Sequence, residues 1–507
     1  YHFCDATKAH NYFVYEDDLP LLFDEFNKIK SGEITEHSLH YRWLDRQHNP
    51  VWINCRGDVI LDEFNKPLYL IGCVNEIGKR QKADNISGLL REPCLEEYVS
   101  SKSKNNITGY FMQIGIDDFD EINGRFGLKC GDEILKQFSM CMQSCINENQ
   151  KIYELGNGRF IIMDLANHSK EDILELYDEL KKSVEVALEE NDYRMVYTIS
   201  VGIVEIDKEM KDYDTLIKYS DFALNEAKKK GKNSCYFFTQ DKYKQFIRRR
   251  EIRVELQNAV DHNFENFDVY YQPIIDIHTR NLIGAEALMR FKMKRNEQIE
   301  FISPAEFIPI LEESDLIIPA GRWILRQAVA CCKKWQEFIP EFKVNVNLSY
   351  VQIIKSRILD EIKQALKDYT LKPALLGIEV TESGYLENTY HYKKLWSSLK
   401  EEGITLILDD YGTGYSNAYR LSDLTPHYIK IDRVLTQKAL SSNYERSILI
   451  YIIEMAHSLK LNVCIEGVET EEELQEIKKL NPDYIQGYLF GKPAPEDEFY
   501  NRQIKKK

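Results

Sequence analysis

The sequence has no long hydrophobic run. Its longest apolar stretch, ILIYIIEMA at 448–456, is far shorter than the roughly 18 residues of a membrane-spanning helix and is typical of a buried helix. A signal-peptide pattern is also missing. We therefore expect a cytoplasmic protein, with no membrane segment within this chain. Because the sequence starts with Tyr1 and not with Met, we expect the natural protein to extend further at its N-terminus.

The sequence also lacks the cysteine pattern of a disulfide framework or a zinc site. Its 11 cysteines are an odd number and are scattered along the chain. Cys141 and Cys145 have helical spacing, but no histidine or further cysteine follows at the spacing of zinc ligands. Reduced thiols packed inside cytosolic domains are the simplest interpretation.

Positive charge is scarce. The chain has 66 Lys and Arg against 82 Asp and Glu, which gives a formal net charge of −16. This balance argues against binding of a nucleic acid polymer over the whole surface, although a small cationic pocket for a phosphorylated ligand is compatible with it. Hydrophobic residues make up 43% of the 507 residues, which is enough for several separate cores.

Residues 1–80 have the pattern of a small α+β unit. Apolar and polar residues alternate from 37 to 78, and turn signals at 48–50 and 65–67 separate the expected strands. This part resembles the second half of a PAS domain, and the first strands of that fold are not in the sequence. The resemblance implies a partial sensor domain, but the sequence does not identify its input signal.

A second α/β unit is predicted for residues 84–238. The segment 110–123 is typical of a strand that runs into an acidic turn, and 151–165 is typical of a hairpin around a Gly-Asn-Gly turn. A further strand at 195–206 is followed by an amphipathic helix at 214–233, which has a basic end and a glycine stop. The charged segment 239–262 is predicted to be a helical linker to the rest of the chain.

From Phe267 onward, short apolar runs recur about every 30 residues, which is the length of one strand plus one helix. This alternation predicts a parallel sheet, and the number of units favours a closed (β/α)8 barrel over an open sheet. In such barrels the catalytic groups lie at the C-terminal strand ends. The polar residues at the ends of these runs are Glu286, Asn347, Glu379, Asp409, Asp410, Lys430, Asp432, Glu466 and Gln486.

The carboxylates in this set predict a metal site. A single acid at a strand end is more often a helix cap or a solvated edge, but carboxylates at four separate strand ends are hard to explain in that way. Clustered carboxylates repel one another, and bound divalent cations remove that cost. Because the donors are oxygens, with no Cys or His, the set favours Mg²⁺ or Mn²⁺. Asp409 can bridge two ions roughly 3.5–4 Å apart and Asp410 can bind the second, which suits phosphodiester cleavage.

The same stretches resemble the signature of the EAL domain, a family of phosphodiesterases that act on cyclic di-GMP. The resemblance covers about residues 265–495. It implies a (β/α)8 barrel, within a domain at 263–500, that hydrolyses cyclic di-GMP to linear pGpG with two ions of Mg²⁺ or Mn²⁺. The motifs occur in family order: YQP at 271–273, EALMR at 286–290, NVNLS at 345–349, EVTE at 379–382, DDYGTGYSN at 409–417, KID at 430–432, EGVE at 466–469 and QGYLFGKP at 486–493.

The resemblance also implies roles for individual residues. Lys430 would orient or polarise the attacking water, with Glu466 and Gln486 as further catalytic residues. Glu382 would anchor the loop after Asp410, which family members use to link dimerisation with activity, so a homodimer is expected. The implied metal ligands are Glu286, Asn347, Glu379, Asp409, Asp410 and Glu466. The implied substrate contacts are Gln272, Leu288, Arg290 and Asp432.

The unit at 84–238 resembles a GGDEF domain, the fold of diguanylate cyclases, with a degenerate signature. The sequence GNGRF at 156–160 stands where the family has GGDEF or GGEEF, so Gly158 and Arg159 replace two acids. Gly115 stands where the family has its first metal-binding Asp, and Asp117 follows two residues later. Because cyclisation of GTP needs metal ions, we predict that cyclase activity is absent.

Other features of the GGDEF pattern persist. Asn123 and Asp132 match the guanine-binding pair of the family, and Lys228 and Lys232 match its phosphate-binding cations. GTP binding in a regulatory role is one hypothesis, and a structural spacer is the alternative. For the whole chain, the leading hypothesis is a phosphodiesterase regulated by its PAS and GGDEF domains. The rival is a non-catalytic cyclic di-GMP receptor that signals by a conformational change.

Overall fold

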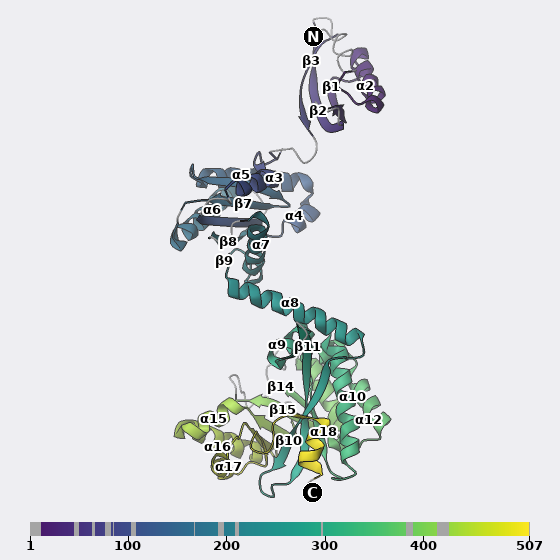
Figure 1. Cartoon of the computed structure of the whole chain (residues 1–507), viewed down its shortest axis with the longest axis vertical. Helices are drawn as coiled ribbons and strands as arrows, with labels where there is room; N and C mark the ends of the chain where they lie inside the picture. The colour runs from purple at the N-terminus through teal and green to yellow at the C-terminus, as the bar shows by residue number, and fades with distance from the viewer. Residues whose placement is uncertain are drawn as a thin grey trace. The chain divides into compact units, whose positions relative to one another are not determined.

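The computed structural model describes residues 12–44, 50–62, 66–76, 83–84, 86–102, 108–166, 168–190, 197–207, 212–295, 298–381, 389–412 and 425–505. The chain divides into two compact units, Tyr1–Lys244 and Gln245–Lys507. Within the described residues, no helix is both long enough and apolar enough to span a membrane. Figure 1 shows the elements of each part in the order of the chain.

The first unit begins with one helix packed on a three-stranded antiparallel sheet. The strands are β1 (Glu36–Leu44), β2 (Pro50–Leu61) and β3 (Pro67–Glu76), in the order β1-β2-β3. Helix α2 (Leu19–Ser31) follows the short turn η1 (Glu16–Asp18) and ends at Gly32, whose left-handed backbone (φ 75°) satisfies the last turn. Leu22, Phe26 and Ile29 lie on one face of α2 and pack with Tyr41 and Ile53 of the sheet.

The next part of the first unit is a six-stranded sheet with helices on both faces. The strand order is β4-β6-β7-β5-β8-β9, and β5 pairs antiparallel with β7 and β8. Side chains of β5 alternate between two apolar cores, because Met112 and Ile114 face one and Phe111 faces the other. The elements are β4 (Leu90–Arg91), α3 (Glu92–Lys102), β5 (Gly109–Ile116), α4 (Phe119–Phe126), α5 (Leu128–Cys145), β6 (Gln150–Gly156), β7 (Arg159–Asp164), α6 (Lys170–Glu190), β8 (Ile199–Ile206), α7 (Tyr213–Lys229) and β9 (Cys235–Phe237).

The charged segment 239–262 forms the helix α8 (Gln240–Asp261). From Gln245 onward it belongs to the second unit, where Ile252, Leu256 and Ala259 join the apolar core. Arg248 lies 2.8 Å from Glu300 and also contacts Glu306. These apolar and ionic contacts fix α8, from Arg248 onward, to the barrel that follows.

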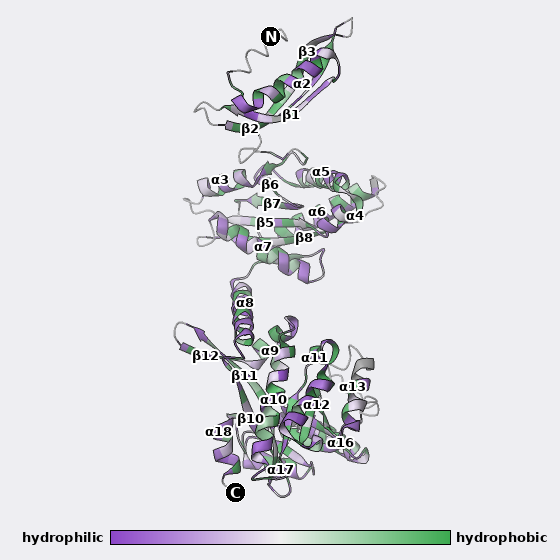
Figure 2. Cartoon of the chain, turned by 90° about the vertical axis from the view of Figure 1, so that its right-hand side faces the viewer, coloured by the Kyte–Doolittle hydropathy of each residue, from purple (hydrophilic) through white to green (hydrophobic). Residues whose placement is uncertain are grey.

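The second unit contains a closed barrel of eight strands in the order β10-β11-β13-β14-β15-β16-β17-β18, with β18 pairing back to β10. Figure 1 shows α10 and α12 on one flank of the barrel and α15, α16 and α17 on the other. The β11–β12 hairpin extends from the barrel, and Figure 2 shows hydrophilic residues at its end. The strands are β10 (Phe267–Asp276), β11 (Leu282–Arg295), β12 (Gln298–Ile302), β13 (Lys343–Asn347), β14 (Leu376–Thr381), β15 (Thr405–Tyr411), β16 (Tyr428–Ile431), β17 (Asn462–Glu466), β18 (Tyr484–Gln486) and β19 (Ala494–Pro495).

Helices connect and cover these strands. Short 3-10 and π turns complete the connections. The helices and turns are α9 (Pro304–Glu313), α10 (Ile317–Trp335), α11 (Tyr350–Lys355), α12 (Ile358–Tyr369), η2 (Pro373–Leu375), α13 (Thr389–Glu401), α15 (Arg433–Ser441), α16 (Asn443–Ser458), α17 (Glu471–Lys478), α18 (Glu496–Phe499) and η4 (Tyr500–Ile504).

The barrel differs from a fully parallel one in its first strand. Strand β10 runs antiparallel to both of its neighbours, β11 and β18, while β11 and β13 to β18 pair in parallel. The expectation of a fully parallel sheet is therefore wrong for this strand. The physical reason is the short connection between Asp276 and Leu282, which allows a hairpin but leaves no room for a crossover helix.

Candidate active site at the C-terminal strand ends

Lys430 is the centre of the candidate site. It lies on β16 with only 1% of its surface exposed. Its Nζ atom contacts carboxylates from four other strands. These contacts are Glu286 Oε2 on β11 at 2.9 Å, Glu379 Oε2 on β14 at 2.9 Å, Asp409 Oδ1 on β15 at 3.5 Å and Glu466 Oε1 on β17 at 2.7 Å. The barrel therefore brings together side chains that lie up to 180 residues apart in the sequence (466 − 286).

Amide side chains orient the buried carboxylate of Glu286. Asn347 Nδ2 donates to Glu286 Oε1 at 2.7 Å, and Gln486 Nε2 donates to Glu286 Oε2 at 2.7 Å. Gln486 Nε2 also lies 3.1 Å from Oε1 of Gln272, which is paired with Glu286 across the β10–β11 ladder. These contacts arise because β10, β11, β13 and β18 all present a polar residue at the same end of the barrel.

The electrostatics of this cluster favour the binding of cations. The Lys430 ammonium holds the pKa of Glu286 below its ordinary value, although burial acts in the opposite direction. Burial, with Glu286 nearby, raises the pKa of Glu379 well above the ordinary value. Burial also raises the pKa of Asp409, and it raises that of Glu466 to about 8. A single ammonium thus leaves several of these buried carboxylates without a compensating charge.

Asp409 and Asp410 lie at the end of β15 with an unusual backbone. Asp410 has φ 56°, in the left-handed region, and its N–H donates to Asp409 Oδ1 at 2.9 Å. Asp is one of the few non-glycine residues that adopt this region readily. Burial, and then the neighbouring Asp409, raise the pKa of Asp410 to about 6. Asp409 therefore makes the negative charge of Asp410 more costly, whereas the backbone N–H of Asp410 stabilises the charge of Asp409.

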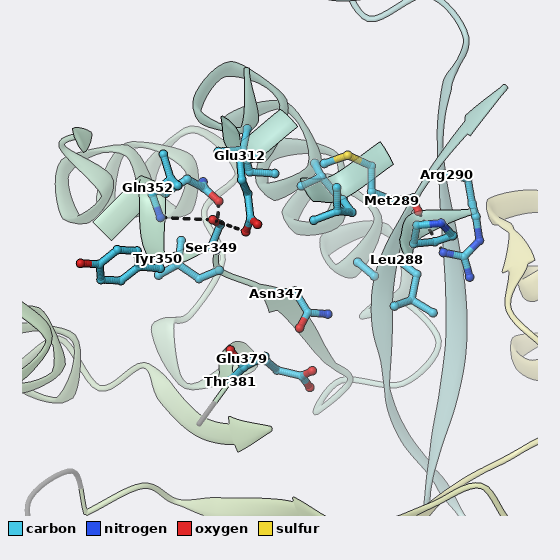
Figure 3. A pocket seen from close by; sticks show the side chains of 18 residues that line it. Leu288, Met289, Arg290, Glu312, Asn347, Ser349, Tyr350, Gln352, Glu379 and Thr381 are labelled. Carbon is cyan, nitrogen blue, oxygen red and sulfur yellow. Dashed lines mark hydrogen bonds between the residues drawn. The ribbon is translucent and has the colours of Figure 1, made fainter. Parts of the chain in front are cut away.

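Two cavities open at this end of the barrel. One of about 250 Å³ is lined by Glu286, Asp409, Lys430, Glu466 and Gln486, together with Gln272, Leu288, Arg433, Gly467, Glu469, Gly487 and Tyr488. A larger one, of about 540 Å³, is lined by Asn347 and Glu379 and extends toward α10 and α11. Figure 3 shows Leu288 and Arg290 of β11 on one side of the larger cavity and Ser349, Gln352 and Glu312 on the other.

The predicted substrate contacts do not all line the same cavity. Leu288 lines both cavities, and Gln272 lines the smaller one. Arg290 lines the larger cavity, where its guanidinium donates to the Met289 carbonyl at 2.9 Å. Asp432 caps helix α15 by accepting a hydrogen bond of 2.7 Å from Val434 N. Glu382, the predicted loop anchor, lies outside the described residues, as does the segment 413–424.

Asn345 is a site residue that was not predicted from the sequence. This residue is 2% exposed, and its Nδ2 donates to Glu379 Oε1 at 2.8 Å and also contacts the Tyr428 hydroxyl. Strand periodicity was the available signal, because Asn345 lies two residues before Asn347 and so shares its face of β13. Glu312, which accepts a hydrogen bond of 2.7 Å from Ser349 Oγ in the larger cavity, was also missed. It lies on a helix outside the recurring strand pattern.

The donor set fits hard divalent cations in charge and chemistry. Within the described residues, no group of three or more His, Cys, Asp and Glu is already arranged around a common metal position. Lys430 Nζ instead occupies the position between the four carboxylates. The surplus of buried carboxylates and the buried Gln486 Oε1, which has no partner among the described residues, provide oxygen ligands of the type that Mg²⁺ and Mn²⁺ prefer.

The predicted GTP-binding residues lie in the part of the first unit that forms the six-stranded sheet. Asn123 is on α4, and its Oδ1 lies against Gly131 of α5, next to Asp132. Lys228 Nζ would lie 3.2 Å from a Cβ atom added at Gly115. It therefore lies where a side chain at position 115 would begin. The fourth predicted residue, Lys232, pairs with Asp118 at 2.6 Å.

Charged residues around the altered GGDEF signature contact other residues of the same domain. Arg159 is paired with Gly115 across the β5–β7 ladder and lies 3.5 Å from Asp221. Asp117, which follows Gly115, accepts hydrogen bonds from Thr198 Oγ1 at 2.7 Å and Ser200 Oγ at 2.8 Å. The ammonium of Lys228 therefore lies next to position 115, and Asp117 is engaged in hydrogen bonds within the fold.

Three family models match consecutive parts of the chain. The PAS fold matches residues 3–74, the diguanylate cyclase GGDEF domain matches 82–234 and the EAL domain matches 253–493. The chain therefore contains a PAS fold, a GGDEF domain and an EAL domain, in this order. This order agrees with the resemblances found in the sequence.

Curated proteins are similar to this chain over part of their length. The signaling protein YkoW of Bacillus subtilis is 31% identical over 399 residues, which cover 78% of this chain and 48% of YkoW. The cyclic di-GMP phosphodiesterase PdeR of Escherichia coli is 27% identical over 470 residues, which cover 90% of this chain and 68% of PdeR. The chain spans about half the length of the first relatives it matches. Among solved structures, the phosphodiesterase PaMucR in complex with c-di-GMP is 28% identical, with a TM-score of 0.46, and the match covers 49% of this chain and 99% of PaMucR.

Proposed function

We propose that this chain is a metal-dependent phosphodiesterase that hydrolyses cyclic di-GMP to linear pGpG. One observation carries the proposal: at the strand ends of an EAL domain, Lys430 lies within 3.5 Å of carboxylates from four different strands. Relatives named as cyclic di-GMP phosphodiesterases, among them PdeR and NbdA, support the choice of substrate.

In this proposal, some residues of the site hold the metal ions and others orient these ligands. Two ions of Mg²⁺ or Mn²⁺, when bound, would activate water and stabilise the negative charge that develops on the phosphate. The residues that would hold them are Glu286, Asn347, Glu379, Asp409, Asp410 and Glu466. Asn347 and Gln486 fix the orientation of Glu286 through the hydrogen bonds described above.

Lys430 and the cavity walls supply the remaining chemistry. Lys430 lines the smaller cavity and remains protonated, because although burial lowers its pKa, four neighbouring carboxylates raise the pKa well above the ordinary value. It can therefore orient an attacking water and stabilise charge next to Glu466. Gln272, Leu288 and Arg290 line the cavities and would contact the dinucleotide, with Arg290 as a partner for phosphate.

One assay tests this function. The purified chain is incubated with cyclic di-GMP and Mg²⁺ or Mn²⁺, and the products are separated by chromatography. Formation of pGpG that stops with a chelator and returns with added metal is the expected result. Binding of cyclic di-GMP without any pGpG would instead support the rival function, a receptor that signals by conformational change.

We also propose that the GGDEF domain lacks cyclase activity and regulates the EAL domain through bound GTP. Support for the lost activity comes from Gly115 and Arg159, which place a gap and a positive charge where a metal site needs acids. One relative, MucR of Pseudomonas aeruginosa, is named as a bifunctional cyclase and phosphodiesterase and is 25% identical over 420 residues, so a direct assay is needed.

The arrangement of the chain completes the proposal. We place a partial PAS-like sensor at 1–80, the GGDEF domain at 84–238, the helical linker at 239–262 and the phosphodiesterase domain at 263–500. Helix α8 (Gln240–Asp261) supports the linker boundaries. We further propose a homodimer in which Glu382 anchors the loop after Asp410, and the elution volume of the intact chain in size-exclusion chromatography with light scattering tests the dimer.

A further inference from the structure

A third cavity lies at the opposite end of the barrel from the candidate active site. It has a volume of about 310 Å³. Gly284, Lys343, Thr405, Tyr428 and Asn462, which line it, lie at the beginnings of barrel strands, whereas the catalytic candidates lie at the strand ends. The complete lining is Ile274, Ile283, Gly284, Lys343, Asn345, Lys400, Thr405, Thr425, Pro426, His427, Tyr428, Lys460, Asn462 and Tyr484. This set is called the basal pocket below.

A mainly apolar layer, crossed by the hydrogen bond from Asn345 to Glu379, separates the basal pocket from the candidate active site. Ile274, Ile407, Tyr428 and Cys464 are buried together inside the barrel. The basal pocket shares no lining residue with either of the cavities at the strand ends. It is therefore a separate compartment and not an extension of the cyclic di-GMP site.

The basal pocket carries positive charge in a chain that is strongly acidic overall. Three lysines, Lys343, Lys400 and Lys460, reach it from three separate segments, and none of its lining residues is Asp or Glu. Among the described residues, none of the three lysines has a carboxylate within ion-pair distance. Surface lysines usually lie apart from one another in solvent, but here three of them line one cavity. The whole chain has a net charge of −16, so this cavity differs in charge from the rest of the molecule.

His427 adds a hydrogen-bond donor to this cluster. Its Nδ1 accepts the N–H of Leu406 at 2.9 Å, so the neutral ring carries its hydrogen on Nε2. Burial, and then the positive charges of Lys400 and Lys343, lower the pKa of His427. The pocket therefore offers ammonium and ring N–H groups to a ligand, and no carboxylate in its lining competes for them.

Three carboxylates next to lining residues are already engaged. Glu379 accepts a hydrogen bond of 2.8 Å from Asn345 and lies 2.9 Å from Lys430 Nζ, and the other two are Asp276 and Asp483. Asp276 and Asp483 flank Tyr484. Asp276 accepts hydrogen bonds from Thr279 N at 2.8 Å and Thr279 Oγ1 at 2.9 Å. Asp483 accepts from Val463 N at 2.7 Å and lies 3.0 Å from His457 Nε2. None of the three acids is a lining residue, so the lysine charges remain available to a ligand.

We propose that the basal pocket is a second ligand site, which binds a small molecule carrying a phosphate group. Several cationic donors around one cavity are the chemistry that recognises a phosphate dianion. The volume exceeds that of a free phosphate, and the rings of Tyr428 and Tyr484, which meet edge to face at 5.7 Å, give an apolar wall for an organic part. The ligand class is a phosphate monoester of nucleotide size, with inorganic phosphate as the minimal form.

Isothermal titration of the intact chain in a metal-free buffer without phosphate tests the site. The probes are inorganic phosphate, guanosine 5′-monophosphate and uncharged guanosine. Both phosphate-bearing probes are expected to bind, guanosine is not, and tighter binding of the monophosphate would identify an organic ligand and not free phosphate. If neither phosphate-bearing probe binds at millimolar concentration, the proposal is wrong.

Variants locate the binding. The double variant Lys343→Ala with Lys460→Ala is expected to weaken binding of phosphate by about tenfold or more, because it removes two charge-assisted contacts. The charge-keeping pair Lys343→Arg with Lys460→Arg should bind nearly as the parent does, and thermal unfolding checks that each variant is folded. Lys438→Ala on the exposed face of α15 is the matched control and should not change the affinity.

Two further variants separate this site from the others in the chain. Binding should persist in Lys430→Ala, which alters the candidate active site, and in Lys228→Ala, which alters the candidate GTP site. Loss of binding in either of these variants, with full binding in the Lys343→Ala and Lys460→Ala pair, would overturn the proposal. Because the measurement needs neither metal nor turnover, it does not depend on the proposed phosphodiesterase activity.

Discussion

Asn345 donates a hydrogen bond of 2.8 Å to Oε1 of Glu379, while Lys430 contacts the other oxygen, Oε2, at 2.9 Å. Both oxygens of a fully buried carboxylate are thereby held, one by a neutral amide and one by a charge. Asn345 also contacts the Tyr428 hydroxyl at the basal side. The orientation of Glu379 therefore depends on the barrel interior below it as well as on the site above it.

Replacing Asn345 with Ala is expected to destabilise the barrel by about 1–3 kcal/mol, because a buried acceptor loses its donor. Urea unfolding followed by circular dichroism measures this change. Asn258→Ala, on helix α8, is the control. The Asn258 side chain is exposed, so its replacement should cost less stability. Equal stability of the Asn345→Ala variant and the parent would contradict the role given to this hydrogen bond.

Replacing Lys430 with Met is expected to affect both stability and turnover. It leaves several buried carboxylates without their ammonium, and breaking a buried ion pair in this way costs about 3–5 kcal/mol. Turnover of cyclic di-GMP should fall by roughly 10²-fold or more, because a positioned charge that orients the attacking water is lost. Unfolding in urea and initial rates with Mg²⁺ measure the two effects.

A second substitution separates these two effects. Lys430→Arg keeps a positive charge among the buried carboxylates, so the free energy of unfolding should recover in part, while the displaced charge should leave turnover low. If turnover recovered along with stability, Lys430 would be a structural residue only.

The unfolding free energy of the metal-free protein is expected to fall as the pH rises through neutrality. The pKa of Glu466 is raised to about 8 and that of Asp410 to about 6, so the folded state binds these protons more tightly than the unfolded chain does. Their contribution is fully present below about pH 4, near the unfolded values, and is lost as the pH passes 6 and then 8. Chemical unfolding at a series of pH values measures the trend.

Two comparisons check the origin of this trend. Glu466→Gln should remove the upper part of the decline, because the neutral amide does not titrate. Saturating Mg²⁺ should reduce the decline in the parent, since a bound cation favours the ionised carboxylates. A parent protein whose stability rises between pH 6 and 8 without metal would show that the sign is wrong.

Removal of one predicted metal ligand should weaken metal binding and turnover together. Glu286→Gln keeps the shape of the side chain and loses its charge, so we expect Mn²⁺ affinity to fall by about tenfold or more and pGpG formation to fall with it. Electron paramagnetic resonance of free Mn²⁺ gives the affinity. Glu471→Gln is the control, because Glu471 is exposed and pairs with Arg280 on the surface. Unchanged Mn²⁺ affinity in Glu286→Gln would remove this residue from the ligand set.

The GGDEF domain should bind GTP without forming cyclic di-GMP. We expect no cyclic product from GTP with Mg²⁺, and a lower KM or a higher kcat of the phosphodiesterase when GTP is present. The double variant Asn123→Ala with Asp132→Ala should abolish the stimulation while leaving the basal rate unchanged. Unchanged kinetics at saturating GTP would favour a structural spacer, and a cyclic product would show that the altered signature is still active.

Much of the candidate site follows from local sequence pattern. Apolar runs that end in Glu379, Asp409 or Glu466 are visible in the sequence without any knowledge of long-range contacts. The predicted order of three domains agrees with the family models. The antiparallel direction of β10 was also accessible, because the connection from Asp276 to Leu282 is too short for a crossover helix. It was missed because the regular spacing of the later units was extended to the first strand.

Other features were not accessible from local pattern. Lys343, Lys400 and Lys460 look like ordinary surface lysines in the sequence, and only closure of the barrel brings them to one cavity. Asn345 carries the right periodicity, but nothing local shows that it meets Glu379, which lies on the next strand. Contacts of this kind depend on strand register, which long-range pairing sets.

The sequence by itself determined which side chains end the strands, and therefore the chemical type of the site: oxygen donors, one lysine and a few amides. The tertiary structure alone decided that Lys430 lies between four carboxylates, and that the basal pocket gathers lysines behind an apolar layer. The reason is physical. Residue type and periodicity are properties of neighbouring positions, whereas the distance between two charges from different strands is fixed only when the sheet closes and its register is set.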